Sequence, residues 1–214
     1  MTKGFAGVLA LCAACTLLGA DALAAKKPKP DPAPAAAAPR TGVDSLPQTV
    51  VDEMTRYTSP GPQHQWLSGF AGTWTTRTRV LENPEAKPVE FSGGAEYRMI
   101  LGGRFLELES HAEVNGNESH GLGFYGYDSF KEKYSFYFIH DGETQALTGL
   151  GDRDSTGATV TFAVAMDMPM AGEHGKPIRA VLRRVSGNRH VFEMYEKYVD
   201  DREWKVLEIT YERH

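Results

Sequence analysis

The spacing of hydrophobic residues changes at Trp74. Before it, apolar residues recur every three or four positions, as on one face of a helix, whereas after it they alternate with polar residues, as in strands with one buried face. The helical part covers residues 45–71 and is interrupted by the Ser-Pro-Gly-Pro sequence of residues 59–62. We therefore expect two short helices, the second of which begins at Pro62.

The alternating pattern continues to the C-terminus in about ten segments separated by turn-forming residues. Consecutive strands joined by tight turns form an antiparallel meander, and closure removes the exposed edges of such a sheet. The pattern predicts an all-β fold, an up-and-down lipocalin-like barrel of about ten antiparallel strands with two short N-terminal helices packed near one end. The expected strands are residues 73–81, 88–101, 104–114, 118–128, 133–140, 145–151, 158–168, 176–186, 189–198 and 203–213.

Two-residue turns predict which residues lie opposite each other. A turn at residues 102–103 pairs Tyr97 with Leu108 on one face and Arg98 with Glu107 on the other. We expect the apolar face to point inward and the charged face to meet water. The alternative is that part of the mixed face lines a polar cavity.

The last predicted hairpin brings carboxylates together. A turn at residues 200–201 places Glu193 opposite Glu208, and Glu196 opposite Lys205. Two like charges in this position cost energy unless a cation, a metal or water lies between them. In a cavity, paired carboxylates can perform acid–base chemistry because their pKa values separate.

Ion pairing is the simpler explanation for these charged residues, and we assign no catalytic residue. Arginines on neighbouring strands, among them Arg183, can neutralise the carboxylates. A possible polar site remains as the alternative, and it comprises Arg98, Glu107, Arg179, Glu193 and Glu208.

The apolar face favours ligand binding, because aromatic-lined pockets form in the mouths of such barrels. We expect non-enzymatic binding of a small apolar or amphipathic molecule, supported by a cavity above about 300 Å³. An isomerase- or hydrolase-type enzyme using Glu193 and Glu208 is one alternative, and a structural envelope protein with a filled barrel is another. The candidate ligand-binding residues are Tyr97, Met99, Leu108, Tyr125, Phe136, Phe138, Phe192 and Met194.

Histidines and methionines suggest metal sites, but each has a simpler explanation. A turn at residues 115–116 places His111 opposite His120, with two carboxylates nearby, a set that suits a divalent metal. The thioethers of residues 166–170 and the nearby His174 suit Cu(I). A solvated hairpin tip and a hairpin loop with a core methionine account for the same residues, so we assign no metal.

Haem would require an inward histidine in an apolar pocket, and His140 and His190 lie on aromatic-rich strands. A strand histidine beside aromatic residues is more often a core or rim residue, so we assign no cofactor. The sequence also lacks the nucleophile motif G-x-S-x-G and the zinc motif H-E-x-x-H.

The N-terminus resembles a secretory signal peptide. Lys3 precedes an apolar run that ends in Ala-Leu-Ala at residues 22–24, which predicts cleavage after about residue 24 and a periplasmic or secreted protein. A lipoprotein signal with Cys15 is the weaker alternative. Both cysteines lie in this segment, so the mature chain has no disulfide, thiol nucleophile or cysteine metal site.

The domain boundaries follow from composition. Residues 1–24 form the signal peptide, residues 25–43 a disordered Pro/Ala-rich linker, and residues 44–214 a single β-barrel domain. Residues 1–40 carry a net charge of +3, which leaves −8 for the rest of the chain. This acidic body argues against a nucleic-acid partner, and the apolar run is too short for a stable membrane span. A small-molecule ligand remains as the expected partner, whereas the sequence leaves the oligomeric state open.

Several stretches resemble known proteins. Gly72-Thr73-Trp74 is similar to the G-x-W signature of lipocalin-like barrels, in which Trp74 would plug one end. The region after residue 58 resembles an uncharacterised bacterial family, number 1579 of the domain-of-unknown-function series, which implies a calycin-type barrel. Nitrobindin-like proteins resemble it distantly, in fold only. The stretches that carry the family resemblance are PGPQHQWL with AGTW, EYRMILGGRFLE, GYDSFKEKY, HVFEMYE and LEITYER.

Overall fold

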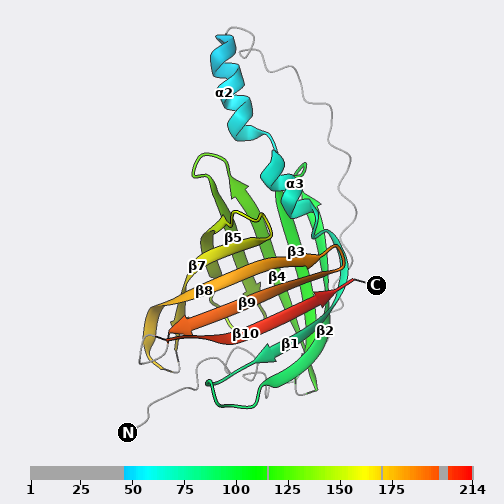
Figure 1. Ribbon diagram of the computed structural model, residues 1–214, viewed down its shortest axis with the longest axis vertical. Helices are drawn as coiled ribbons and strands as arrows, with labels where there is room; N and C mark the ends of the chain where they lie inside the picture. The colour runs from blue at the N-terminus through cyan, green and yellow to red at the C-terminus, as the bar shows by residue number, and fades with distance from the viewer. Residues whose placement is uncertain (1–45, 115, 170, 198–201, 214) are drawn as a thin grey trace. The chain divides into compact units, whose positions relative to one another are not determined.

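The computed structural model describes residues 46–114, 116–169, 171–197 and 202–213. Within them, ten antiparallel strands close into one up-and-down barrel in which each strand pairs with the next and the last pairs with the first (Figure 1). The predicted fold class is therefore confirmed. The elements are α2 (Gln48–Thr58), α3 (Pro62–Ser68), β1 (Gly72–Val80), β2 (Val89–Ile100), β3 (Phe105–Val114), β4 (Asn117–Asp128), β5 (Lys133–His140), β6 (Leu147–Arg153), β7 (Thr159–Met168), β8 (Glu173–Ser186), β9 (Arg189–Lys197) and β10 (Glu203–Glu212).

Each predicted strand is present, and its ends lie within three residues of the expected positions. The largest difference is at β8, which begins at Glu173 because its pairing with β7 continues past an irregularity to Met168. The predicted turn between β2 and β3 contains Gly102 and Gly103 with φ of 67° and 82°. Glycine adopts this left-handed conformation without a steric cost, which explains why the sequence signals the turn clearly.

The apolar face of the sheet points inward. Along β7, the buried residues Val160, Phe162, Val164, Met166 and Met168 alternate with side chains that are exposed or half-buried. This alternation follows from the two-residue period of a strand, which sends successive side chains to opposite faces. The core of the protein is therefore the inside of the barrel.

Predicted pairings are right for most hairpins. Tight turns leave little freedom in register, and a shift of one residue would move apolar side chains to the solvent face. The confirmed pairs are Tyr97 with Leu108, Arg98 with Glu107, His111 with His120, and Glu193 with Glu208.

One predicted pairing is wrong. Glu196 lies opposite Trp204, not opposite Lys205, because a β-bulge at Val206 adds a residue to β10. The extra residue turns Val206 inward, where it is 1% exposed. Glu196 is likewise buried inside the barrel, and its carboxylate lies 3.0 Å from the ammonium nitrogen of Lys176.

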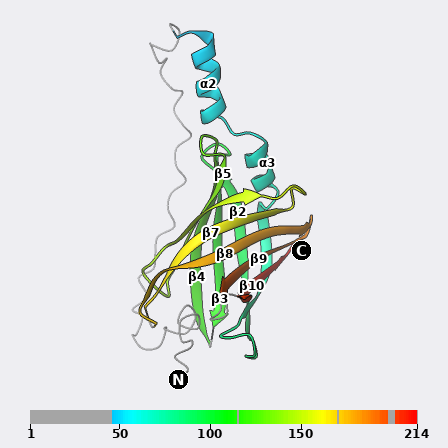
Figure 2. The same ribbon diagram turned by 60° about the vertical axis from the view of Figure 1, so that its left-hand side comes forward.

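Helix α3 lies at one end of the barrel and packs against β3 and β4 (Figures 1 and 2). Pro62 begins the helix as predicted, and the side chain of His64 accepts a hydrogen bond from the backbone N–H of Gly61. Trp66 and Leu67 of this helix are buried in the hydrophobic core. The short helix therefore covers apolar side chains at this end.

Helix α2 belongs to a separate compact unit that ends at Ser59. Along its whole length no residue is buried, and Val50, Met54 and Tyr57 are exposed. The predicted signal peptide and linker lie outside the described residues. In the part of the chain that is described, no helix is both long and apolar enough to cross a membrane.

Candidate functional site

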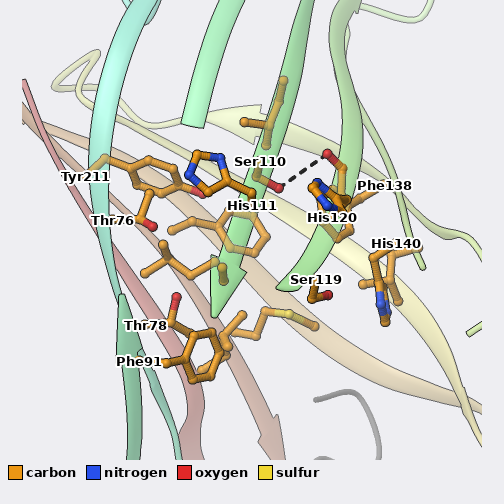
Figure 3. A pocket seen from close by; sticks show the side chains of 18 of the residues that line it. Thr76, Thr78, Phe91, Ser110, His111, Ser119, His120, Phe138, His140 and Tyr211 are labelled. Atoms are coloured by element: carbon orange, nitrogen blue, oxygen red, sulfur yellow. Dashed lines mark hydrogen bonds between the residues drawn. The ribbon is translucent and has the colours of Figure 1, made fainter. Parts of the chain in front are cut away.

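A pocket with mainly apolar walls lies inside the barrel (Figure 3). Its lining includes Val114 and Ser119, which lie near the strand ends away from α3. Its volume is about 140 Å³, and side chains from β1 to β6, β9 and β10 line it. Figure 3 shows Thr76, Thr78 and Phe91 on one side, with Phe138 and His140 on the other. The interior is therefore neither completely filled nor as large as the roughly 300 Å³ at which drug-sized pockets begin.

Six of the eight predicted ligand-binding residues line this pocket, and two do not. Tyr97 is 1% exposed and packs against Phe70 at the α3 end. Met99 lies still nearer α3, in a separate surface hollow beside His64 and Ser68. Both residues lie on β2 and on the inward face, as predicted. The tilt of the strand places them near α3 and away from the mouth of the pocket. The predicted residues that line the pocket are Leu108, Tyr125, Phe136, Phe138, Phe192 and Met194.

Several lining residues were missed by the sequence reasoning. Most of them share the inward face of their strands, and eight of them carry a hydroxyl or imidazole group, which a search for apolar residues does not find. Alternation from the inward Trp74 would have found two of them, because residues 76 and 78 share its face. The missed residues are Thr76, Thr78, Phe91, Ser110, His111, Ala112, Val114, Ser119, His120, Gly121, His140, Leu147, Leu207, Ile209 and Tyr211.

Two glycines on β4 help to create the space. A Cβ atom at Gly121 would lie 2.5 Å from Cζ of Phe138, and one at Gly123 would lie 3.1 Å from Cδ2 of the same ring. The Phe138 ring therefore packs directly on the bare backbone of β4. A side chain at Gly121 would displace this ring and change the shape of the pocket.

The deep end of the pocket contains tyrosines. Tyr125 and Tyr211 line it, and Tyr97 lies beside both, with ring centroids 6.4 Å and 5.8 Å away. Burial raises the pKa of Tyr97 and Tyr125 well above the ordinary value, and it raises the pKa of Tyr211 to about 12. All three hydroxyls therefore stay protonated at neutral pH.

His190 lies in the core near these tyrosines and not in the pocket. Its ring stacks on Tyr211 at 4.2 Å and meets the edge of Trp74 at 4.4 Å. Among the described residues neither ring nitrogen has a hydrogen-bond partner. Burial, together with the positive charges of Arg213 and Arg184, lowers the pKa of His190 to about 3. This histidine is therefore uncharged in the folded protein.

The second candidate haem ligand, His140, lines the pocket at its mouth. Its Nδ1 accepts a hydrogen bond from the backbone N–H of Gly142 at 3.1 Å, which leaves the proton on Nε2. Nε2 lies 3.1 Å from a carboxylate oxygen of Glu143. Both nitrogens are engaged, so the ring is held at the rim.

The possible polar site lies on the outer face of the barrel. Lys205 donates hydrogen bonds to both Glu193 and Glu208, and Arg183 lies 3.4 Å from Glu193. Although burial alone raises the pKa of Glu193, these cations hold it below its ordinary value. None of the described carboxylates in this group lines the pocket.

The remaining members of the predicted polar site are ion-paired separately. Arg98 bonds Glu107 at 2.5 Å, and Arg179 bonds Glu203 at 2.8 Å. These pairs form a charged outer surface and are not brought together into one site. An enzyme that used Glu193 and Glu208 would therefore have to work outside the pocket.

The candidate metal ligands are only partly brought together. Met166 and Met168 are buried inside the barrel, whereas the side chain of His174 is 87% exposed. Met170 lies outside the described residues. His111 and His120 are adjacent but exposed at the rim. The described residues contain no group of three or more histidine, cysteine, aspartate or glutamate residues that could hold a metal ion.

A solved structure supports the fold. The crystal structure of Rv2717c from M. tuberculosis is similar, with a TM-score of 0.52 and 16% identity over 73% of this chain and 99% of that chain. A redesigned β barrel has a TM-score of 0.37 and 13% identity over 69% of this chain and 94% of that chain. A search of the curated proteins found no match.

The sequence also matches a protein-family model. The model describes a protein of unknown function, DUF1579, and the match covers residues 59–213, which include α3 and the entire barrel. The chain therefore belongs to the DUF1579 family.

Proposed function

We propose that this protein binds a small apolar or amphipathic molecule inside its barrel. The observation that carries the proposal is the open pocket of about 140 Å³ with mainly apolar walls, because a barrel with a purely structural role needs no such space. Apolar cavities of about 150 Å³ are large enough to hold benzene. The pocket suits a single ring or a short chain, and a longer ligand would extend through the mouth.

The ligand's apolar part would be held by contact with aromatic and aliphatic walls. Phe136, Phe192 and Leu108 lie on three different strands and face the same space. Burial of apolar surface contributes roughly 25 cal/mol per Å² before the entropic costs of binding are subtracted. A ring-sized ligand would therefore bind with modest affinity.

Closing the pocket should abolish this binding. Ala112 lines the pocket, and a phenylalanine at this position would occupy the space that a ligand needs. We expect toluene to bind the wild-type protein saturably and the Ala112→Phe variant at least tenfold more weakly, as measured by isothermal titration calorimetry. Ala165→Phe is the matched control, because Ala165 is exposed on the outer face of β7. Equal toluene affinity of the two variants, or no binding to the wild type, would contradict the proposal.

We also propose that the protein is exported. The charged start, the apolar run and the Ala-Leu-Ala sequence at residues 22–24 support it. Expression in a Gram-negative host should yield a periplasmic protein whose N-terminus begins near residue 25. Cytoplasmic protein that retains Met1 would be the contrary result.

A further inference from the structure

Three tyrosine hydroxyls meet at the deep end of the pocket. Tyr97, Tyr125 and Tyr211 come from β2, β4 and β10, and each residue is at most 3% exposed. Tyr125 and Tyr211 belong to the pocket wall, and Figure 3 shows Tyr211 among the side chains that face it. The hydroxyl of Tyr97 is fully buried, and the polar groups that face it are the hydroxyls of Tyr125 and Tyr211.

A buried hydroxyl is unfavourable unless it forms a hydrogen bond, and phenylalanine would fill the same space without that cost. Phe136 and Phe192 show that the barrel uses phenylalanine elsewhere on the same pocket wall. The grouping of tyrosines at one end therefore indicates a need for hydroxyl groups there. A polar atom of a bound molecule would satisfy this need.

The charge of the surroundings limits which polar atom this can be. The hydroxyls are protonated at neutral pH, so they can both donate and accept hydrogen bonds. His190, which stacks on Tyr211, is uncharged, and no lysine or arginine of the described chain lines the pocket. A carboxylate would enter this region without a neutralising cation, which is costly in an apolar site. A neutral hydroxyl or carbonyl group suits the site.

We infer that the pocket takes small neutral alcohols, phenols or carbonyl compounds, with the oxygen directed inward to Tyr125 and Tyr211 and the apolar body against the walls. The inference rests on the proposed function, since it concerns the same pocket. It adds an orientation and a chemical class, and it makes the two tyrosines the residues that determine specificity. Hydrocarbons of the same size would bind more weakly, because they offer the hydroxyls of Tyr125 and Tyr211 no further hydrogen bond.

The test compares p-cresol with toluene, which differ by one hydroxyl group. We expect the wild-type protein to bind p-cresol at least tenfold more tightly in calorimetric titration, although p-cresol is the more water-soluble of the two. Tyr125→Phe and Tyr211→Phe should each reduce this preference to threefold or less while leaving toluene affinity within twofold. Tyr137→Phe is the matched control, because Tyr137 is 40% exposed on the outer face of β5, and it should keep the full preference. Thermal unfolding of each variant establishes that it is folded.

The outcomes separate this inference from the proposed function. Toluene binding without a preference for p-cresol would overturn the inference and leave the proposed function in place. A preference that persists in both Tyr125→Phe and Tyr211→Phe would also overturn it, because the oxygen would then bind elsewhere. Failure of both compounds to bind would overturn the two together. If Tyr97 only supports its neighbours, the Tyr97→Phe variant should keep the preference for p-cresol over toluene, whereas Tyr125→Phe and Tyr211→Phe should lose it.

Discussion

Replacement of Trp74 by alanine should lower the free energy of unfolding by about 3–5 kcal/mol, the usual cost of removing a buried tryptophan. The indole is 3% exposed, and its N–H donates a hydrogen bond to the backbone oxygen of Phe70 at 2.8 Å. One side of the ring meets His190, and the guanidinium of Arg213 lies 4.3 Å from its centre. The truncation would leave a cavity where the chain enters β1 and would remove the link between β1 and the segment after α3.

Urea denaturation followed by circular dichroism measures this loss as a shift in the midpoint. Phe130→Ala is the control, because Phe130 is 79% exposed and a surface substitution of this kind changes stability by about 0.5 kcal/mol or less. A loss below about 1 kcal/mol in the Trp74→Ala variant would show that the indole contributes little to closing the barrel.

The position of Trp74 is an example of what the sequence predicts well. Its place at the change from helical to alternating spacing, together with the preceding Gly72, locates the start of the first strand. The structure places the indole at the end of the barrel that α3 covers, close to β9 and β10. Local signals of this kind are strong because turn residues and a two-residue period are both encoded over a few neighbouring positions.

Features that depend on three-dimensional arrangement were harder to predict. The bulge at Val206 has no local signal, because valine suits either face of a strand. It shifts the pairing by one residue, so Glu196 lies opposite Trp204 instead of Lys205. The pocket boundary is similar, since Tyr97 and Met99 share a face with true lining residues but lie too close to α3. The strand tilt of the closed barrel decides this position along the axis, and a single strand does not encode the tilt.

The functional groups of the site were only partly predicted for a related reason. Tyr125 was identified as an aromatic wall residue, whereas the meeting of its hydroxyl with those of Tyr97 and Tyr211 depends on three strands that are far apart in the sequence. Conversely, Glu193 and Glu208 were correctly paired but lie outside the pocket, where Lys205 neutralises them. Register alone shows which side chains meet, and only the closed barrel shows what they face.

His190 should make the protein less stable in mild acid. Its pKa is lowered from 6.5 to about 3 in the folded state, first by burial and then by the charges of Arg213 and Arg184. Between these values the unfolded chain binds a proton that the folded chain does not, so stability falls as the pH decreases below 6.5. Each pH unit in this range costs about 1.4 kcal/mol, which amounts to about 2 kcal/mol between pH 6.5 and pH 5.

The His190→Leu variant should lose most of this pH dependence, because leucine has a similar volume and binds no proton. At pH 7 the variant should be at least as stable as the wild type, since it removes two buried nitrogens that have no partner among the described residues. The measurement is the urea midpoint of both proteins at pH 7 and pH 5, and His174→Leu is the control at an exposed histidine. Burial also lowers the pKa of His64, but this contribution is common to both proteins and cancels in the comparison. An equal loss of stability in the wild type and His190→Leu would show that the buried imidazole is not the source of the acid sensitivity.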